Sequence, residues 1–192
     1  MKLLEERILR DAVVKAGGVL KVDSFLNHQI DIPLVWELAR EWKRRFADVP
    51  VSKILTVEAS GVPLATIVAS EFGVPLVFAK KTKSINLSGT VYVAEVKSYT
   101  LDKPSQVIVE KRFISPDDHV LLIDDLLSNG CAINGLLQIC ERAGAQVEGI
   151  GIAIEKGFQP GGEELRARGY RVESLAVVDE MNPDTGDITF RE

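Results

Sequence analysis

Cysteine and histidine are scarce in this sequence, which limits the kinds of site it can build. Two of each occur among 192 residues. Cys131 and Cys140 lie nine positions apart in a segment that reads as one helix. That spacing corresponds to about 13 Å of helical rise, too far for a disulfide. No group of cysteines and histidines has the spacing of a zinc site, so the disulfide-stapled and structural-zinc classes are excluded.

Long apolar runs are also missing. No segment approaches the roughly 20 apolar residues that a membrane helix requires. The first residues, Met1–Arg7, place two acids directly after two leucines, whereas a secretory signal needs a longer apolar stretch. We therefore expect a cytoplasmic protein with no membrane partner. Hydrophobic residues still make up 46% of the chain, enough for the core of one domain.

The chain has no surplus of positive charge. Its formal net charge is -5 and its isoelectric point is about 5.2. General nucleic-acid binding requires a basic face, so we expect no nucleic-acid partner. An anionic substrate remains compatible with this composition, because backbone amides and a few lysines can bind phosphate on an acidic protein.

Helix-like and strand-like apolar segments alternate along the chain. The pattern predicts helices over 3–16, 33–46, 63–72, 133–143 and 163–168, and strands over 19–22, 53–57, 75–79, 91–98, 106–113, 120–123, 147–154, 170–178 and 187–191. Residues 23–29 and 80–90 read as polar and irregular, and 102–104 as a turn. We therefore expect one α/β domain over residues 1–192, with a parallel sheet covered by helices on both faces and a small N-terminal addition.

The clearest functional pattern is the stretch Val120–Ala132. Four apolar residues form a predicted strand, two neighbouring acids follow at its carboxyl end, and a turn of small residues then enters a helix. Ligands of open parallel sheets bind at that edge. The free amides of the turn and of the helix N-terminus favour an anion, and Gly130 lets the backbone approach it closely. The pattern therefore predicts a phosphate site.

Asp124 and Asp125 predict a second part of the same ligand. Carboxylates repel phosphate, but they accept hydrogen bonds from the hydroxyls of a sugar. Neighbouring residues of an extended chain point to opposite sides, so one acid can face the ligand while the other orients the loop or a water. Phosphate and vicinal hydroxyls held together indicate a ribose 5-phosphate. The alternative is an ordinary strand–turn–helix with solvated acids.

This stretch resembles the motif with which type I phosphoribosyltransferases bind phosphoribosyl pyrophosphate (PRPP). The resemblance implies that Asp124 and Asp125 are the catalytic acids and hold the ribose hydroxyls. It assigns the 5-phosphate to the loop residues Ser128, Asn129, Gly130, Cys131 and Ala132. The family's loop often ends in a hydroxyl residue, and Ala132 departs from that pattern. One side-chain bond to phosphate is then missing, which leaves more of the binding to the serine and the amides.

An earlier stretch, Val57–Pro63, is similar to the family's pyrophosphate loop. It contains Glu58, Ala59, Ser60 and Gly61, like the glutamate–small–glycine loop of adenine-type members. Small residues there expose amides at the head of a helix. An ordinary strand-to-helix turn is the alternative interpretation.

Lysines follow the next predicted strand, within residues 78–84. The resemblance implies that a mobile loop and hairpin over about 80–113 and N-terminal elements over about 1–32 form a hood at the reaction centre. Closure of the hood would exclude water, and Lys81 would offset the charge of pyrophosphate. A solvated basic loop is the alternative.

Lys156 and Phe158 follow closely after the last long apolar strand, which is predicted over 147–154. The lysine can donate to a carbonyl oxygen of a flat base, and the aromatic ring can lie against that base. The 6-oxopurine members of the family carry a lysine and an aromatic residue at this place. A surface lysine beside a packed phenylalanine is the alternative.

The stretch Leu20–Asp31, with residues 158–161, resembles the xanthine phosphoribosyltransferases of Gram-positive bacteria, and the likeness runs nearly end to end. It implies that Leu20, Asn27 and Lys156 contact the base. The Asn27 amide can donate to a 2-oxo oxygen, which adenine and hypoxanthine lack.

The reaction implied by this resemblance converts xanthine and PRPP into xanthosine 5'-monophosphate and pyrophosphate. Mg²⁺ would bind through PRPP oxygens rather than in a protein cage, and the enzyme would be a homodimer. One alternative is the same chemistry on hypoxanthine, guanine or adenine. A more distant one is a non-catalytic, PRPP-sensing regulator, although such regulators carry an added DNA-binding domain.

Overall fold

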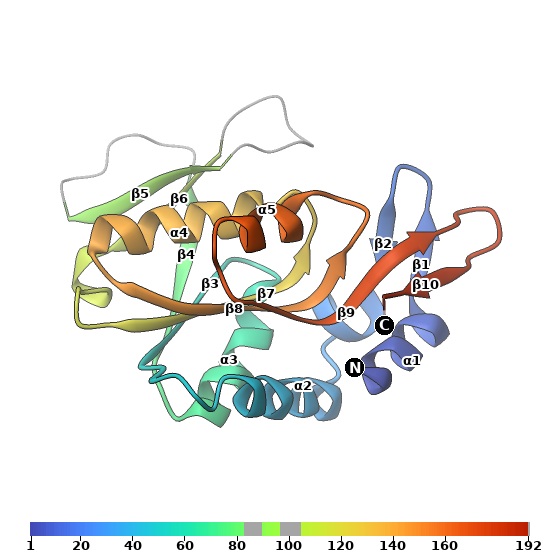
Figure 1. Cartoon of the computed structure of the whole chain (residues 1–192), viewed down its shortest axis with the longest axis horizontal. Helices are drawn as coiled ribbons and strands as arrows, with labels where there is room; N and C mark the ends of the chain where they lie inside the picture. The colour runs from blue at the N-terminus through green and yellow to red at the C-terminus, as the bar shows by residue number, and fades with distance from the viewer. Residues whose placement is uncertain (83–89, 97–104, 192) are drawn as a thin grey trace.

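The computed structural model describes residues 1–82, 90–96 and 105–191. Within these residues an eight-stranded sheet forms the centre of the molecule (Figure 1). In sheet order its strands are β10 (Ile188–Phe190), β9 (Val172–Met181), β8 (Gln146–Lys156), β7 (His119–Leu127), β3 (Lys53–Val57), β4 (Leu76–Thr82), β6 (Ser105–Glu110) and β5 (Val91–Val96). The strands from β9 to β4 are parallel, and β10, β6 and β5 extend the two ends antiparallel.

Helices cover both faces of this sheet (Figure 1). α2 (Ile32–Arg45) and α3 (Gly61–Phe72) lie on one face, and α4 (Cys131–Ala143) and α5 (Gly161–Ala167) lie on the other. Successive residues of β7 alternate between two cores: Leu121 and Ile123 belong to one, Val120 and Leu122 to the other. Burial on both faces explains why the central strands read as continuous apolar runs. The predicted α/β fold class is confirmed.

The N-terminal segment differs from its prediction. α1 (Lys2–Asp11) is shorter than the predicted helix over 3–16, because β1 (Val13–Lys15) pairs with β2 (Val19–Lys21) in a hairpin. Gly17 and Gly18 have φ angles of 79° and 73°, so they turn the chain back on itself. Two β-branched valines open β1 and favour the strand over a further helical turn.

Residues 23–29 are more regular than the polar pattern indicated. Asp23–Asn27 form one turn of π-helix, η1, whose Phe25 and Leu26 are fully buried. These two apolar side chains anchor the turn in the core beside α3. The anchor places Asn27 at the end of η1.

β7 extends well beyond the predicted strand over 120–123. It remains paired with β8 as far as Leu127 and Glu155, so the two acids lie inside the strand and not after it. The strand predicted over 106–113 ends at Glu110, and Lys111–Phe113 form a short 3-10 helix, η2. The other described elements match their predictions to within a few residues. The predicted turn at 102–104 and most of the polar stretch over 80–90 lie outside the described residues.

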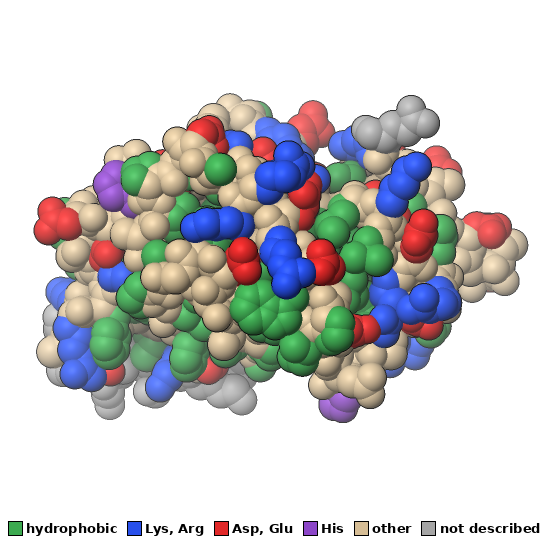
Figure 2. Space-filling model, turned by 90° about the horizontal axis from the view of Figure 1, so that it is seen from below, with side chains coloured by type: hydrophobic (Ala, Val, Ile, Leu, Met, Phe, Trp, Pro, Cys, Tyr) green, Lys and Arg blue, Asp and Glu red, His purple; other side chains and the backbone are tan. Residues whose placement is uncertain are grey.

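Charges of both signs mix on the surface formed by α2 and α3. Figure 2 shows basic and acidic side chains side by side on this face. Exposed ion pairs within α2, Arg40 with Glu37 and Arg44 with Glu41, account for part of the pattern. Among the described residues, no helix is both long enough and apolar enough to cross a membrane.

Candidate functional site

A cavity of about 470 Å³ lies at the carboxyl ends of β7 and β8. Five parts of the chain meet there: the end of β7 with the loop and helix start that follow it, the end of β8, the turn between β1 and β2, the end of β4 and the end of β5. Its lining residues are Gly17, Gly18, Val19, Lys81, Val96, Asp124, Leu126, Leu127, Ser128, Asn129, Gly130, Cys131, Ala132, Ile133, Lys156 and Gln159. A cavity therefore lies at the edge of the sheet where the sequence predicted a ligand site.

The predicted phosphate loop borders this cavity along its whole length. Ser128–Gly130 connect β7 to α4, and Cys131 and Ala132 form the first turn of that helix. Gly130 has a φ of 73°, a left-handed conformation that glycine adopts without strain. Its carbonyl accepts the Asn134 N–H at 2.8 Å, as the first bond of the helix. The amides of the loop and of the helix start are therefore placed where they can serve an anion in the cavity.

Asp124 is buried at the edge of the cavity, with 5% of its surface exposed. Its Oδ1 accepts the backbone N–H of Asp125 at 3.0 Å. Burial first, and then the charge of Asp125, raise the pKa of Asp124 well above its ordinary value. The site thus contains a carboxyl group that is costly to ionise until a ligand supplies hydrogen bonds or positive charge.

Asp125, also 5% exposed, connects two other parts of the predicted site. Its Oδ1 accepts a hydrogen bond from the Ser60 hydroxyl at 3.1 Å. Its Oδ2 accepts one from the Asn27 side-chain amide at 3.2 Å. The second acid therefore orients neighbouring loops, while the first borders the cavity.

The stretch from Glu58 to Gly61 packs against the strand ends. A Cβ atom on Gly61 would lie 2.2 Å from Thr56 Oγ1 and 3.2 Å from Asp124 Oδ1, so the close approach needs glycine. Glu58 accepts the backbone N–H of Lys81 at 2.7 Å, and the Glu58–Ala59 peptide bond is cis. Lys81 itself lines the cavity. The loop and the lysine thus lie next to the acids, although Glu58, Ala59, Ser60 and Gly61 are not among the lining residues.

Lys156 lies at the end of β8 and lines the cavity. Its ammonium donates a hydrogen bond to the Gly18 carbonyl at 2.9 Å, which joins β8 to the turn of the β1–β2 hairpin. Burial lowers the pKa of Lys156 below its ordinary value. The lysine is a donor in a half-buried place, where a hydrogen bond to a carbonyl oxygen is stronger than in water.

The other three predicted base contacts are placed differently. Asn27 does not line the cavity, and its amide is bonded to Asp125. Leu20 is 4% exposed and belongs to the hydrophobic core. Phe158 is 43% exposed and lines a neighbouring cavity of about 710 Å³ with Gly18 and Met181. The structure brings Lys156 to the phosphate loop, but Leu20, Asn27 and Phe158 are not among the residues that line this cavity.

Sequence reasoning missed several lining residues. Gly17 and Gly18 directly follow the helix predicted over 3–16 and were assigned no role in the site, but their turn forms one wall of the cavity. Gln159 lines the cavity beside Lys156, and its Oε1 is buried without a hydrogen-bond partner among the described residues. Such an acceptor is costly to leave unpaired, so a donor group on a ligand can satisfy it. A lone glutamine after a strand gave no signal for this role.

Comparison with known proteins agrees with this geometry. The family model described as Phosphoribosyl transferase domain matches residues 21–175. Xanthine phosphoribosyltransferase of Bifidobacterium longum (strain NCC 2705) is 57% identical over 192 residues, which is 100% of both chains. The protein of that name from Lachnoclostridium phytofermentans is 55% identical over 100% of this chain and 98% of its own. Xanthine phosphoribosyltransferase 2 of Clostridium botulinum (strain Langeland) is 50% identical over 96% and 97%.

Solved structures share the fold. The adenine phosphoribosyltransferase of Giardia lamblia, complexed with 9-deazaadenine, superposes with a TM-score of 0.71 at 26% identity, covering 87% of this chain and 92% of that one. The Saccharomyces cerevisiae adenine phosphoribosyltransferase gives a TM-score of 0.73 over 91% of this chain and 99% of its own, but at 18% identity it supports the fold alone. The family model and the full-length relatives together show that the chain belongs to the phosphoribosyltransferase family.

Proposed function

We propose that the protein transfers the 5-phosphoribosyl group of PRPP to xanthine, giving xanthosine 5'-monophosphate and pyrophosphate. One observation carries the proposal: a single cavity joins the phosphate loop, the buried acid of β7 and the lysine of β8. These three parts match the three parts of the product, which are a phosphate, a ribose and an oxopurine. The names of the full-length relatives support xanthine as the base.

The proposed roles follow from what each group can donate or accept. Loop residues Ser128–Ala132 would bind the 5-phosphate through amides and the serine hydroxyl. Asp124 and Asp125 would accept hydrogen bonds from the ribose hydroxyls. Their negative charge would also stabilise the positive charge that develops on the ribose as pyrophosphate leaves. That positive charge, together with hydrogen bonds from the ribose hydroxyls, would in turn favour the ionised form of Asp124, whose pKa is raised in the protein alone.

Base choice would depend on two hydrogen-bond donors, Lys156 at the end of β8 and Asn27 at the end of η1. A lysine ammonium only donates, so Lys156 would pair with a carbonyl oxygen and not with the amino group of adenine. Asn27 would donate to the 2-oxo group after leaving Asp125. We keep Leu20 and Phe158 as proposed contacts of the base, with the ring of Phe158 exposed on the cavity beside Gly18.

The pyrophosphate would lie near the loop Glu58–Gly61 and Lys81. Glu58 fixes the backbone of Lys81, and Lys81 lines the cavity, so its ammonium can offset the charge of the leaving group. We also keep the proposed hood, with elements over about 1–32 and 80–113. Its support among the described residues is the β1–β2 turn, which borders the cavity.

The described residues fit a Mg²⁺ ion held mainly by the substrate. They contain no group of three or more histidine, cysteine, aspartate or glutamate residues placed to hold a metal, and Asp124 is the one acid among the described lining residues. When bound to PRPP, Mg²⁺ would neutralise part of the pyrophosphate charge. Asp124, as the acid of the cavity lining, would be a protein carboxylate available to the ion or its waters. A homodimer and a cytoplasmic location remain predictions of the family resemblance.

A turnover assay tests the proposal. The purified protein, PRPP and Mg²⁺ are incubated with xanthine, guanine, hypoxanthine or adenine, and the nucleotide product is separated by chromatography. We expect xanthosine 5'-monophosphate, with the highest kcat/KM for xanthine. A higher value for another base would replace xanthine as the substrate. Tight PRPP binding without product from any base would favour the sensing regulator.

A further inference from the structure

The first residue of α5 touches the backbone of the phosphate loop. Gly161 N–H donates to the Ser128 carbonyl at 3.1 Å. A Cβ atom at Gly161 would lie 2.3 Å from that oxygen and 2.6 Å from the Gly130 nitrogen. No other residue type fits so close to the loop without moving it. The start of α5 therefore supports the loop, and Gly161 itself is not a lining residue of the cavity.

This contact determines the direction of a donor in the loop. The Ser128 carbonyl points toward α5, where it accepts the Gly161 N–H. In a planar trans peptide the C=O and the following N–H point in opposite directions. The Asn129 N–H therefore points away from α5. Because Ser128 and Asn129 both line the cavity, the contact fixes one of the amides that would meet the 5-phosphate.

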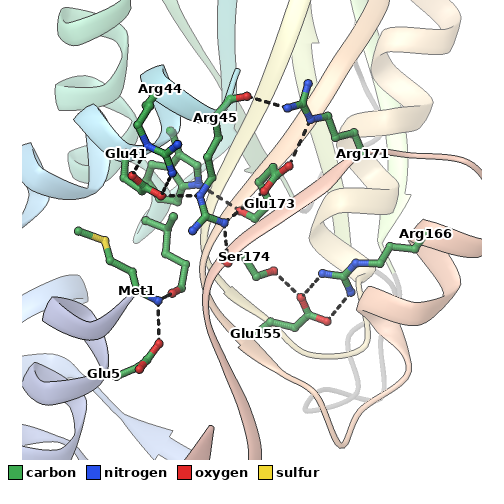
Figure 3. A network of polar contacts seen from close by, with 12 residues as sticks. Met1, Glu5, Glu41, Arg44, Arg45, Glu155, Arg166, Arg171, Glu173 and Ser174 are labelled. Atoms are coloured by element: carbon green, nitrogen blue, oxygen red, sulfur yellow. Dashed lines mark hydrogen bonds and ion pairs between the residues drawn. The ribbon is translucent and has the colours of Figure 1, made fainter. Parts of the chain in front are cut away.

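An ion pair holds α5 in this position. Arg166 donates from Nη1 and Nη2 to the two carboxylate oxygens of Glu155, at 2.7 Å each, and the Ser174 hydroxyl donates to the same carboxylate (Figure 3). Glu155 is 2% exposed and pairs in register with Leu127, the residue before the phosphate loop. A Cβ at Gly162 would lie 1.9 Å from Glu155 Oε1, so α5 lies directly on the carboxylate.

The pair is hard to break once formed. Burial raises the pKa of Glu155, but the hydrogen bonds from Arg166 and Ser174 outweigh it and hold the pKa below its ordinary value. The carboxylate is therefore charged, and removing its partner would leave a buried charge uncompensated. Arg168, just after α5, also donates to the Asn134 side chain of α4. Both ends of the short helix are thus tied to elements that flank the loop.

We propose that Glu155, Arg166 and Gly161 are positioning residues, which hold the phosphate loop in the geometry that binds the 5-phosphate of PRPP. This inference rests on the proposed function, because it assigns the loop to that phosphate. None of the three residues lines the cavity, so they act through the loop and not on the substrate. Arg166→Ala and Gly161→Ala are the sharpest variants. Glu155 is less suitable, because it neighbours Lys156 in sequence.

The expected result is a change in one Michaelis constant and not the other. A displacement on the order of 1 Å in a binding group can lower a rate up to ~100-fold. We expect the KM for PRPP to rise at least about tenfold in both variants, while the KM for the base stays within about twofold. Arg166→Lys, which keeps the charge but loses the planar two-point contact, should fall between the parent and Arg166→Ala.

Arg171→Ala is the matched control. Arg171 also pairs with a carboxylate, because its Nη1 donates to both oxygens of Asp48 at 2.8 and 2.9 Å, and its side chain is 35% exposed against 40% for Arg166. It immediately precedes β9, which runs parallel to β8 and β7, so it lies at the amino ends of these strands, whereas the phosphate loop follows the carboxyl end of β7. This control should lower thermal stability without changing the KM for PRPP.

The kinetic results distinguish positioning of the phosphate loop from general destabilisation of the protein. An unchanged KM for PRPP in any folded, active variant at Arg166 or Gly161 overturns the inference. An equal rise in the Arg171 variant also overturns it, because general destabilisation would then explain the effect. If Arg166→Ala does not fold, Arg166→Lys and Gly161→Ala provide the test. If the parent protein transfers no phosphoribosyl group, the proposed function fails. Calorimetry with ribose 5-phosphate then tests the loop by itself: weaker binding in the variants supports the inference, and equal binding overturns it.

Discussion

The side-chain amide of Asn27 donates to the carboxylate of Asp125 at 3.2 Å, across 98 positions of sequence. The other oxygen of that carboxylate accepts the Ser60 hydroxyl at 3.1 Å. One acid therefore joins the residue that would read the base to the loop that would bind pyrophosphate. Substitutions on either side are expected to affect both substrates, so kinetic tests must report the constants for PRPP and for the base separately.

Replacing both Asp124 and Asp125 with asparagine should weaken PRPP use strongly and leave the fold intact. Hydrogen bonds to a charged acceptor contribute about 1.5–3 kcal/mol. We therefore expect kcat/KM for PRPP to fall by roughly tenfold to a hundredfold for each lost carboxylate. Circular dichroism and the melting temperature check the fold. Unchanged PRPP kinetics in the double variant would contradict the sugar-binding assignment.

Asp124→Asn alone should increase stability while it lowers activity. The folded pKa of Asp124 is raised, so the native state binds more protons than the unfolded state above the unfolded pKa of about 3.9. This carboxyl group therefore destabilises the protein progressively as pH rises from about 4 toward the folded pKa. Asparagine removes that effect and can still accept the Asp125 N–H.

The measurement is the melting temperature of parent and variant from pH 4 to pH 8. A gain of about 1 kcal/mol would raise the melting temperature by about 2–4 °C for a chain of this size. The difference should be smallest near pH 4 and grow with pH. A variant that is less stable than the parent at pH 8 would show that the carboxylate is already well compensated in the protein alone.

Asn27→Ala and Lys156→Ala should give different patterns across one substrate panel. Losing a partner for a buried polar group costs roughly 1–3 kcal/mol, or about fivefold to a hundredfold or more in kcat/KM. Asn27→Ala should therefore reduce xanthine use more than hypoxanthine use, because hypoxanthine lacks the 2-oxo group. Lys156→Ala should reduce the use of xanthine, guanine and hypoxanthine alike, because all three share the 6-oxo group.

Gln29→Ala, on the same segment but exposed, is the control for the Asn27 variant and should leave base choice unchanged. Because Asn27 also bonds Asp125, the KM for PRPP is measured in parallel. Equal loss on all three bases in Asn27→Ala would mean that Asn27 orients the acid and does not read the base.

Alkylation of Cys131 should inactivate the enzyme, and PRPP should protect it. Cys131 lines the cavity within the phosphate loop, so an added group would occupy the place of the phosphate. Cys140 is 1% exposed, and burial raises its pKa to about 12, so it should react slowly. Mass spectrometry of peptides identifies the modified thiol. Cys131→Ser should resist inactivation, whereas full activity after complete modification of Cys131 would argue against its loop as the phosphate site.

Most helices and strands could be predicted because their sequence patterns are local. The strand Lys53–Val57 was predicted with its observed bounds, since four of its five residues are buried in a continuous run. The helix predicted over 3–16 was wrong beyond Asp11, because the prediction grouped Val13 with Leu4 and Ile8 although Val13 lies five positions after Ile8. Only the pairing of Val13–Lys15 with Val19–Lys21 reveals the hairpin, and that contact belongs to tertiary structure.

The residues of the candidate site likewise fall into two groups, those that local sequence predicts and those that long-range contacts place. The loop Ser128–Ala132 follows its strand directly in sequence, so its position could be predicted and the cavity includes it. The bond from Lys156 to Gly18 joins residues 138 positions apart, and nothing in either neighbourhood indicates it. Long-range contacts of this kind determine which groups around the site are free to meet a ligand, and a single sequence does not encode them in a readable pattern.

The Gly18 carbonyl accepts the hydrogen bond of Lys156, so it competes with the base for the same ammonium donor. Any oxopurine that takes this donor must first replace the backbone carbonyl, so its measured affinity is a difference between two similar interactions. That cost is the same for every base that uses the lysine. It therefore lowers all such affinities together and leaves their ratios, which are what selectivity measures, unchanged.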